Sequence, residues 1–121
     1  GPHAGAVYPA TCTGGRSAPP LNPLGLGGEV ELVKLEKCSA IPDFSPLGRC
    51  SALQTLVLAD CGDVPSLRFI RSLPKLRRVV FSGDTRVVDG NLHPLVGIPE
   101  IRMKDRRGYN LSVEEIRRAA R

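Results

Sequence analysis

Residues 53–61 read Leu53-Gln54-Thr55-Leu56-Val57-Leu58-Ala59-Asp60-Cys61, with apolar residues or cysteine at the first, fourth, sixth and ninth positions. The same frame recurs 23 residues later and 23 residues earlier. The other two copies are Val30, Val33, Leu35 and Cys38, and Leu76, Val79, Phe81 and Asp84. Asp84 is the one frame position that carries neither an apolar residue nor cysteine. Three copies in register predict a structural repeat of about 23 residues.

Each copy of the frame predicts one β-strand. Side chains of a strand point alternately to its two faces, so the fourth and sixth positions face the core and the residues around them face outward. The ninth position needs a small residue that tolerates burial, which is how we interpret Cys38 and Cys61. We therefore expect three parallel strands side by side, centred on Val33-Lys34-Leu35, Leu56-Val57-Leu58 and Val79-Val80-Phe81.

A second apolar pattern follows each strand. Its positions are Ile41, Phe44, Leu47 and Cys50, then Val64, Leu67, Ile70 and Leu73, then Leu92, Leu95, Ile98 and Ile101. The last set corresponds to Leu67, Ile70, Leu73 and Leu76 at a shift of 25 residues instead of 23, which places an insertion around residues 85–90 and predicts a loop there. Prolines in these segments favour extended or single-turn connections, with one helical turn over residues 66–71.

The pattern of residues 53–61 resembles the strand half of a leucine-rich repeat. The segment Ile41-Pro42-Asp43-Phe44-Ser45-Pro46-Leu47 is similar to the return segment of internalin-like repeats. The resemblance implies an α/β fold, a short leucine-rich repeat solenoid with parallel strands on its concave face and a C-terminal capping helix. Its three complete repeats would cover residues 30–100.

The C-terminal part of the chain carries a second resemblance. Its residues are Phe81-Ser82-Gly83-Asp84-Thr85-Arg86-Val87-Val88-Asp89-Gly90-Asn91-Leu92, then Arg106-Arg107-Gly108-Tyr109-Asn110, then Glu114-Glu115-Ile116. They are similar to a terminal block of bacterial leucine-rich repeat proteins. Such arrays occur alone and at the C-termini of larger bacterial proteins, including NACHT-type NTPases of antiphage defence. There the array resembles a sensor or autoinhibitory module.

Both ends of the repeat region depart from the frame. We interpret Gly1 to His3 as a tag-like remnant and residues 4–29 as either a degenerate first coil, with Val7, Ala10 and Cys12 in the frame, or a flexible leader. Residues 101–121 predict an edge strand and a capping helix. Either this strand shifts so that Met103 turns inward, or charge closes the sheet edge. Ser112 and Glu115 form a capping box, so a short helix is expected there, with a frayed tail as the alternative.

The four cysteines, Cys12, Cys38, Cys50 and Cys61, suggest buried free thiols. Three of them fall where the repeat needs a small buried residue, and no C-x-x-C or Cys-His spacing indicates zinc, although a disulfide is the remaining alternative. Free thiols favour a reducing cytoplasm as the location. We expect no metal, no cofactor and no catalytic site, because the chain has no recognisable nucleophile, phosphate-binding or metalloprotease motif. No apolar run is long enough to span a membrane.

Charge is concentrated in the second half of the chain. Residues 1–61 hold four Lys or Arg and five Asp or Glu, whereas residues 62–121 hold thirteen and seven. The frame predicts a partner-binding concave face made of Leu32, Lys34, Thr55, Val57, Arg77, Arg78, Val80 and Arg102, with Arg102 in a lateral column beside Arg77. A second candidate set, for an anion or a nucleic acid, is Lys104, Arg106, Arg107 and Tyr109, with the tyrosine ring as a stacking surface.

These observations favour a non-catalytic protein-recognition module. With the resemblance, they point to the C-terminal sensor or autoinhibitory repeat array of a larger bacterial, defence-type protein. The alternatives are a stand-alone bacterial binder such as an immunity protein, or a basic surface that binds nucleic acid.

Overall fold

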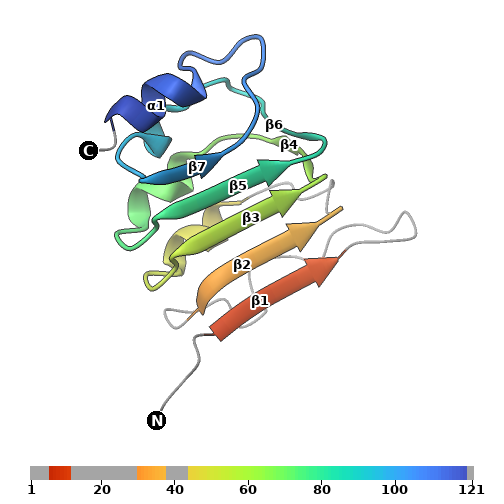
Figure 1. The fold of residues 1–121 in the computed structure, drawn as a ribbon. Helices are drawn as coiled ribbons and strands as arrows, with labels where there is room; N and C mark the ends of the chain where they lie inside the picture. Colours follow the sequence, from red (N-terminus) through yellow and green to blue (C-terminus); the bar gives the residue numbers. More distant parts are fainter. Residues whose placement is uncertain (1–5, 12–29, 38–43, 120–121) are drawn as a thin grey trace.

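The computed structural model describes residues 6–11, 30–37 and 44–119 as an α/β fold built on a parallel sheet (Figure 1). The sheet has five strands in the order β1-β2-β3-β5-β7. They are β1 (Ala6–Thr11), β2 (Val30–Glu36), β3 (Thr55–Ala59), β5 (Arg78–Ser82) and β7 (Glu100–Arg102). Every pair is parallel, and each new strand joins the edge formed by the strand before it. The expected α/β class with parallel strands is confirmed.

The predicted register of the three central strands is also confirmed. Leu56 lies opposite Val33 and Val79, and Val57 lies opposite Lys34 and Val80. The residues expected in the core are buried: Val33, Leu35, Leu56, Leu58, Val79 and Phe81. A shift by one residue would expose both leucines, which at about 25 cal/mol per Å2 of apolar surface would cost several kcal/mol. The alternation of side chains along each strand therefore sets the register.

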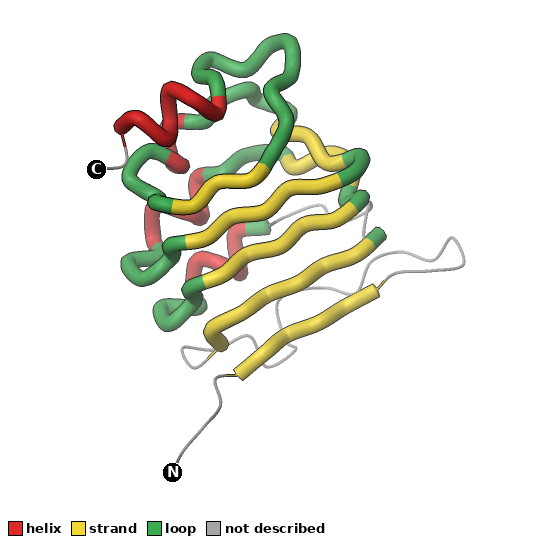
Figure 2. Tube along the Cα trace, viewed as in Figure 1, coloured by secondary structure: helices red, strands yellow, loops and turns green. Residues whose placement is uncertain are grey.

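A second layer of short helices covers one face of the sheet (Figure 2). The 3-10 helices are η1 (Ser45–Arg49), η2 (Arg68–Ser72) and η3 (His93–Leu95). Proline is the second residue of both η1 and η3, in the first turn, where its missing N–H has no helical partner to lose. Apolar side chains from this layer join the strands in one core, among them Leu47, Leu67, Ile70, Leu92 and Leu95. The single helical turn expected over residues 66–71 is confirmed as η2.

The corner after each strand has a repeated left-handed backbone. Lys37, Asp60 and Gly83 are 23 residues apart and have φ of 57°, 53° and 62°. Oδ1 of Asp60 accepts a hydrogen bond of 2.8 Å from the N–H of Asp84. A Cβ at Gly83 would collide with that carboxylate and would also be strained at this φ. The same turn therefore directs the chain away from β2, β3 and β5.

The segment expected to be a loop around residues 85–90 instead contains a strand. β4 (Gly62–Val64) and β6 (Thr85–Val87) pair in parallel as a second, two-stranded sheet. The prediction was wrong because the 23-residue shift continues through this segment: Val87 lies opposite Val64, and both Thr85 and Val87 are buried. Asp84, at the ninth frame position, is exposed, and Thr85 provides the inward-facing side chain next to Cys61.

The last strand has a register other than the one expected. Ile101 lies opposite Val79 and Arg102 opposite Val80, so the shift from β5 to β7 is 22 residues. Arg102 therefore extends the row of Val57 and Val80, and its predicted place in a lateral column beside Arg77 was wrong. Of the two alternatives for this edge, the shifted strand is the one observed, because Met103 is half-buried against the core.

Strand β1 pairs with β2, which favours a first coil over a flexible leader for residues 6–11. Ala10 lies opposite Leu35, whereas the frame placed it opposite Val33. The actual shift is therefore 25 residues at this pair, and the predicted 23-residue shift was wrong. The expectations for Cys12, Cys38 and Ile41 fall on residues outside those described.

The C-terminal helix is present as α1 (Val113–Ala119) and packs beside β7 (Figure 1). Ser112 and Glu115 form the predicted capping box: the N–H of Ser112 donates to Oε1 of Glu115 at 2.8 Å, and the N–H of Glu115 donates to Oγ of Ser112 at 3.1 Å. Val113 and Ile116 are buried. Within the described residues, no helix has the length and apolar character needed to cross a membrane.

Candidate functional site

The sheet face opposite the 3-10 helices is the candidate site, and we call it the open face. Two rows of side chains run across it, perpendicular to the strands. The first row is Leu32, Thr55, Arg78 and Glu100, and the second is Lys34, Val57, Val80 and Arg102. The register thus brings together all but one of the residues predicted for the concave face. The exception, Arg77, is exposed and directly precedes β5.

The centre of the open face is apolar and only half-buried. Leu32, Thr55, Val57 and Val80 each keep part of their surface exposed, whereas the residue that follows each of them along its strand is in the core. Lys34 at one end and Arg78 and Arg102 at the other end are exposed. An apolar centre with arginine at its margin is the composition that protein interfaces favour.

Glu100 belongs to the candidate site, although the sequence pattern did not predict it there. Its Oε2 lies 3.2 Å from Nε of Arg78 and 3.2 Å from Nε of Arg102, so it connects the two rows. Exposed pairs of this kind contribute little to stability, but they hold both guanidinium groups in defined positions. The sequence did not indicate these contacts because the 25-residue shift placed residue 100 before the predicted strand. The observed register places Glu100 in β7, opposite Arg78.

A shallow depression of about 510 Å3 lies where β3, β5 and β7 begin. Its lining residues are Thr55, Arg77, Arg78, Pro99 and Glu100. The depression is therefore continuous with the charged margin of the open face. At the opposite end of the sheet rows, Lys34 and Glu36 form an exposed ion pair of 3.7 Å.

In the second candidate set, for an anion or nucleic acid, two residues are exposed and the other two make contacts within the protein. Lys104 and Arg107 are exposed. Arg106 donates from Nη2 to the carbonyl oxygen of Gly83 at 3.1 Å. The hydroxyl of Tyr109 accepts a hydrogen bond of 3.0 Å from the N–H of Val87, and its ring is half-buried against the core. The ring of Tyr109 is therefore partly used in packing, and its role as a stacking surface stays a prediction.

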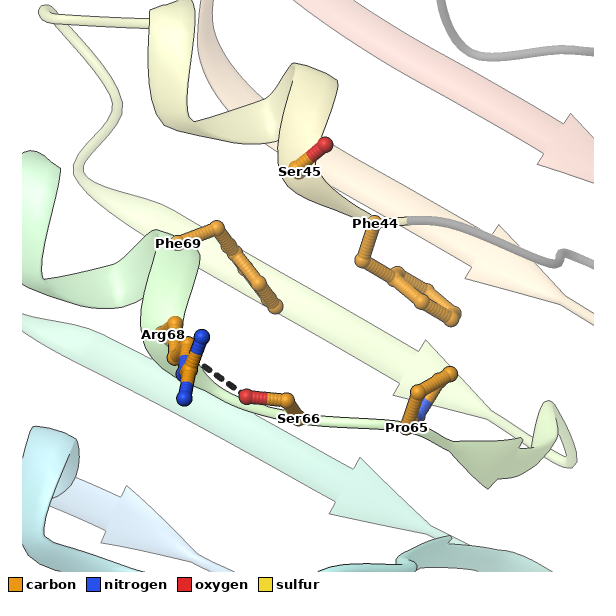
Figure 3. A pocket seen from close by; sticks show the side chains of 6 residues that line it. All are labelled: Phe44, Ser45, Pro65, Ser66, Arg68 and Phe69. Carbon is orange, nitrogen blue, oxygen red and sulfur yellow. Dashed lines mark hydrogen bonds between the residues drawn. The ribbon is translucent and has the colours of Figure 1, made fainter.

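A further cavity, of about 250 Å3, lies in the 3-10 layer (Figure 3). The rings of Phe44 and Phe69 stack there with centroids 6.1 Å apart. Ser66 accepts a hydrogen bond from the N–H of Arg68 at the rim. Both phenylalanines are buried, whereas Ser45, Pro65 and Arg68 are exposed, so the cavity is a surface groove above the packed rings.

The described cysteines belong to the core. Cys50 is a free thiol, and neither Cys50 nor Cys61 has any exposed surface. Burial raises the pKa of the Cys50 thiol, which keeps it protonated and unreactive at neutral pH. The thiol of Cys61 donates to the carbonyl oxygen of Leu35 at 3.2 Å. Among the described residues, no group of three or more His, Cys, Asp or Glu side chains could hold a metal ion.

Comparisons with models of protein families, with curated proteins and with solved structures found no match for this chain.

Proposed function

We propose that this chain is a leucine-rich repeat solenoid that recognises a protein partner through the open face and has no catalytic activity. The observation that carries the proposal is the half-buried apolar centre of that face, formed by Leu32, Thr55, Val57 and Val80. A parallel sheet normally has both of its faces covered. Here the 3-10 helices lie on one face, and the other leaves apolar side chains partly exposed.

The repeat architecture is supported by several independent periodicities. Strand pairing between β2, β3 and β5 follows a 23-residue shift, and the left-handed corners at Lys37, Asp60 and Gly83 follow the same shift. One short helix follows each of β2, β3 and β5 along the chain. In such arrays, neighbouring coils bury a continuous core and the strands form an extended binding surface. The open face would then be the concave face.

The partner surface that suits the open face is apolar at its centre and acidic at one margin. The exposed arginines Arg77, Arg78 and Arg102 gather on the β5–β7 side, where Glu100 is the acidic residue between two of them. Electrostatic complementarity of this kind mainly sets the orientation and the association rate of a complex, while the apolar centre supplies the binding energy.

The biological setting follows from the resemblance to bacterial repeat arrays. We propose that the chain acts as the C-terminal sensor or autoinhibitory array of a larger bacterial, defence-type protein, with a stand-alone binder as the alternative. The buried free thiol of Cys50 supports a cytoplasmic location. Retrieval of the native reading frame tests this setting: an upstream phosphate-binding loop supports the first version, and a start codon directly before residue 3 supports the second.

The experiment that tests recognition compares the wild type with Val57→Lys and with Ser72→Lys as baits. Val57 is central on the open face, and Ser72 is an exposed residue of η2 on the other layer, so each variant adds the same charge. We expect a bacterial partner captured by the wild type and by Ser72→Lys to be lost with Val57→Lys. The partner should also slow amide hydrogen exchange in β3 and β5. Equal capture by all three proteins would contradict the proposal.

A second candidate function, nucleic-acid binding, is favoured by one observation: Lys104 and Arg107 are exposed cations close together in sequence. Binding of this kind weakens steeply with salt, because each neutralised phosphate releases counterions. A filter-binding titration of the wild type and Lys104→Ala with Arg107→Ala at two salt concentrations tests it. We expect at most weak, sequence-independent binding, and tight binding at physiological salt that the double variant abolishes would favour this function instead.

A further inference from the structure

The open face ends in a step where β7 is shorter than its neighbour. Pairing between β3 and β5 continues to Ala59 and Ser82, but pairing between β5 and β7 ends at Val80 and Arg102. After Arg102 the chain turns away from the sheet toward α1 (Figure 1). A cavity of about 270 Å3 lies at this step, and we call it the step cavity. Its lining residues are Val80, Phe81, Ser82, Gly83, Thr85, Arg102, Met103, Lys104 and Arg106.

The step cavity combines apolar side chains with a cationic rim. Val80, Phe81 and Met103 provide apolar surface, and the hydroxyl of Thr85 is already engaged by backbone groups of Cys61, Leu58 and Ser82. The rim carries three cations, Arg102, Lys104 and Arg106, and the lining includes no carboxylate. A ligand for this cavity therefore needs an apolar group and a negative charge close to each other.

Acidic residues near the step include Asp105, Glu100 and the exposed Asp84, and Glu100 pairs with one of the three rim cations, Arg102. Oδ1 of Asp105 accepts a hydrogen bond of 2.7 Å from the N–H of Val113 at the start of α1. Glu100 interacts with Nε of Arg102 and Nε of Arg78. Within the described residues, no carboxylate lies within 4.0 Å of the charged nitrogens of Lys104 or Arg106. Two of the three rim cations, Lys104 and Arg106, are thus left without a carboxylate partner among the described residues, and Arg106 donates to the carbonyl oxygen of Gly83.

We propose that the step cavity binds one apolar side chain of an acidic peptide segment, whose neighbouring carboxylates contact Arg102, Lys104 and Arg106. The inference rests on the proposed function and names the part of the partner that enters the open face. An apolar cavity of about 150 Å3 holds a benzene molecule, so the volume here accommodates a phenyl or leucyl side chain. Arginine and lysine at the rim select carboxylates on the same segment.

Two features favour a peptide over a nucleic acid. The ring of Tyr109, which could stack on a base, is half-buried and its hydroxyl is bonded to Val87. The cations converge on one small apolar cavity, whereas a nucleic-acid site needs a basic track along the backbone with accessible aromatic rings. A peptide with one apolar side chain between carboxylates therefore fits the step cavity better than a nucleic acid does.

The experiment titrates the isotopically labelled protein with the capped peptide Asp-Glu-Phe-Asp-Glu and follows the amide signals by NMR. The matched peptides replace Phe by Ala, or replace every acidic residue by its amide. A single-stranded oligonucleotide of the same net charge is the fourth probe. Two protein variants accompany the wild type: Lys104→Glu at the rim, and Lys75→Glu as a control. Lys75 is exposed in the turn before β5, so its variant makes the same change of charge away from the cavity.

We expect the peptide to shift the amide signals of residues 80–85 and 102–106. Affinity should fall about tenfold when Phe becomes Ala, because the anchor loses its buried apolar surface. It should fall about tenfold with Lys104→Glu and change by less than about twofold with Lys75→Glu. Absence of binding, equal affinity for the Phe and Ala peptides, or tighter binding of the oligonucleotide would each overturn the inference.

The outcome for the step cavity is separable from that for the open face. If the partner is lost with Val57→Lys but is still captured by Lys104→Glu with unchanged affinity, the open face is the binding surface and the step cavity is not part of it. If Val57→Lys has no effect while Lys104→Glu abolishes capture, the step cavity acts alone and the proposed function fails.

Discussion

The hydroxyl group of Thr85 makes three buried or part-buried hydrogen bonds to backbone groups. Its Oγ1 accepts a hydrogen bond of 3.0 Å from the N–H of Cys61. Its own proton is shared between the carbonyl oxygens of Ser82 at 3.0 Å and Leu58 at 3.3 Å. Thr85 is 4% exposed, so water cannot replace these bonds. One hydroxyl therefore satisfies backbone groups of two neighbouring coils where they turn away from the sheet.

Replacement of Thr85 by valine tests this role at nearly constant volume. Thr85→Val leaves the N–H of Cys61 buried without its acceptor, which should lower the free energy of unfolding by about 1–3 kcal/mol. Thr85→Ser keeps the oxygen and loses only a methyl group, so its cost should be near 1 kcal/mol. Urea denaturation followed by circular dichroism measures both. A valine variant as stable as the wild type would show that these hydrogen bonds are not needed.

At the scale of elements, the C-terminal segment protects the last strand of the sheet. Nη2 of Arg117 in α1 donates to the carbonyl oxygen of Ile101 in β7 at 2.7 Å. The loop before the helix is fastened to the preceding coil by the N–H of Asn110, which donates to the carbonyl oxygen of Gly90 at 2.9 Å. A Cβ at Gly90 would collide with the backbone of Gly108, so only glycine allows this approach. Exposed sheet edges pair with other chains, and this arrangement covers one of them.

The capping box makes the stability of α1 depend on pH. Hydrogen bonds from the backbone N–H of Ser112, and from its hydroxyl, lower the pKa of Glu115 below its usual value. A lowered pKa means that the ionised carboxylate stabilises the fold above the usual pKa of glutamate, and that this contribution is lost as the pH falls through the lowered pKa.

We therefore expect acidification to lower the thermal midpoint of the wild type more than that of Glu115→Gln. The amide of the variant still accepts the hydrogen bond but does not titrate, and all other carboxylates are common to both proteins. Thermal unfolding from neutral to acidic pH, followed by circular dichroism, gives the comparison. Parallel curves for the two proteins would contradict a role for the ionised Glu115.

At the scale of the whole molecule, the strands from β2 onward, the 3-10 helices and α1 share one core. A cavity made anywhere in this core should therefore weaken the entire fold. Leu58 is 0% exposed and lies at its centre, opposite Leu35 and Phe81. Leu58→Ala should lower the free energy of unfolding by about 2–5 kcal/mol. Val57→Ala, one residue away on the open face, should cost less than about 1.5 kcal/mol because the side chain is half-buried. Chemical denaturation measures both, and equal costs would mean that the two faces are misassigned.

Local chemistry was enough to predict the central part of the fold. Leu56 and Leu58 alternate with Val57, and this alternation defines an inner and an outer face without any knowledge of the neighbouring strands. Repetition of the pattern then aligned β2, β3 and β5. The capping box of Ser112 and Glu115 was equally predictable, because its two residues are only three positions apart in the chain.

Contacts between segments that are distant in sequence determined the register of β7 and the role of Thr85. Either Ile101 or Met103 could begin or continue an apolar pattern, and only packing against Val79 placed Ile101 in the core and Arg102 in the open-face row. The same packing of β7 against β5 placed the carboxylate of Glu100 beside Arg78 and Arg102. Thr85 replaced Asp84 as the inward residue because its hydroxyl meets backbone groups 24 and 27 positions earlier. Spacing along the sequence predicts which face of its own strand a residue occupies, but the register of an edge strand depends on the energy of packing against the strand beside it.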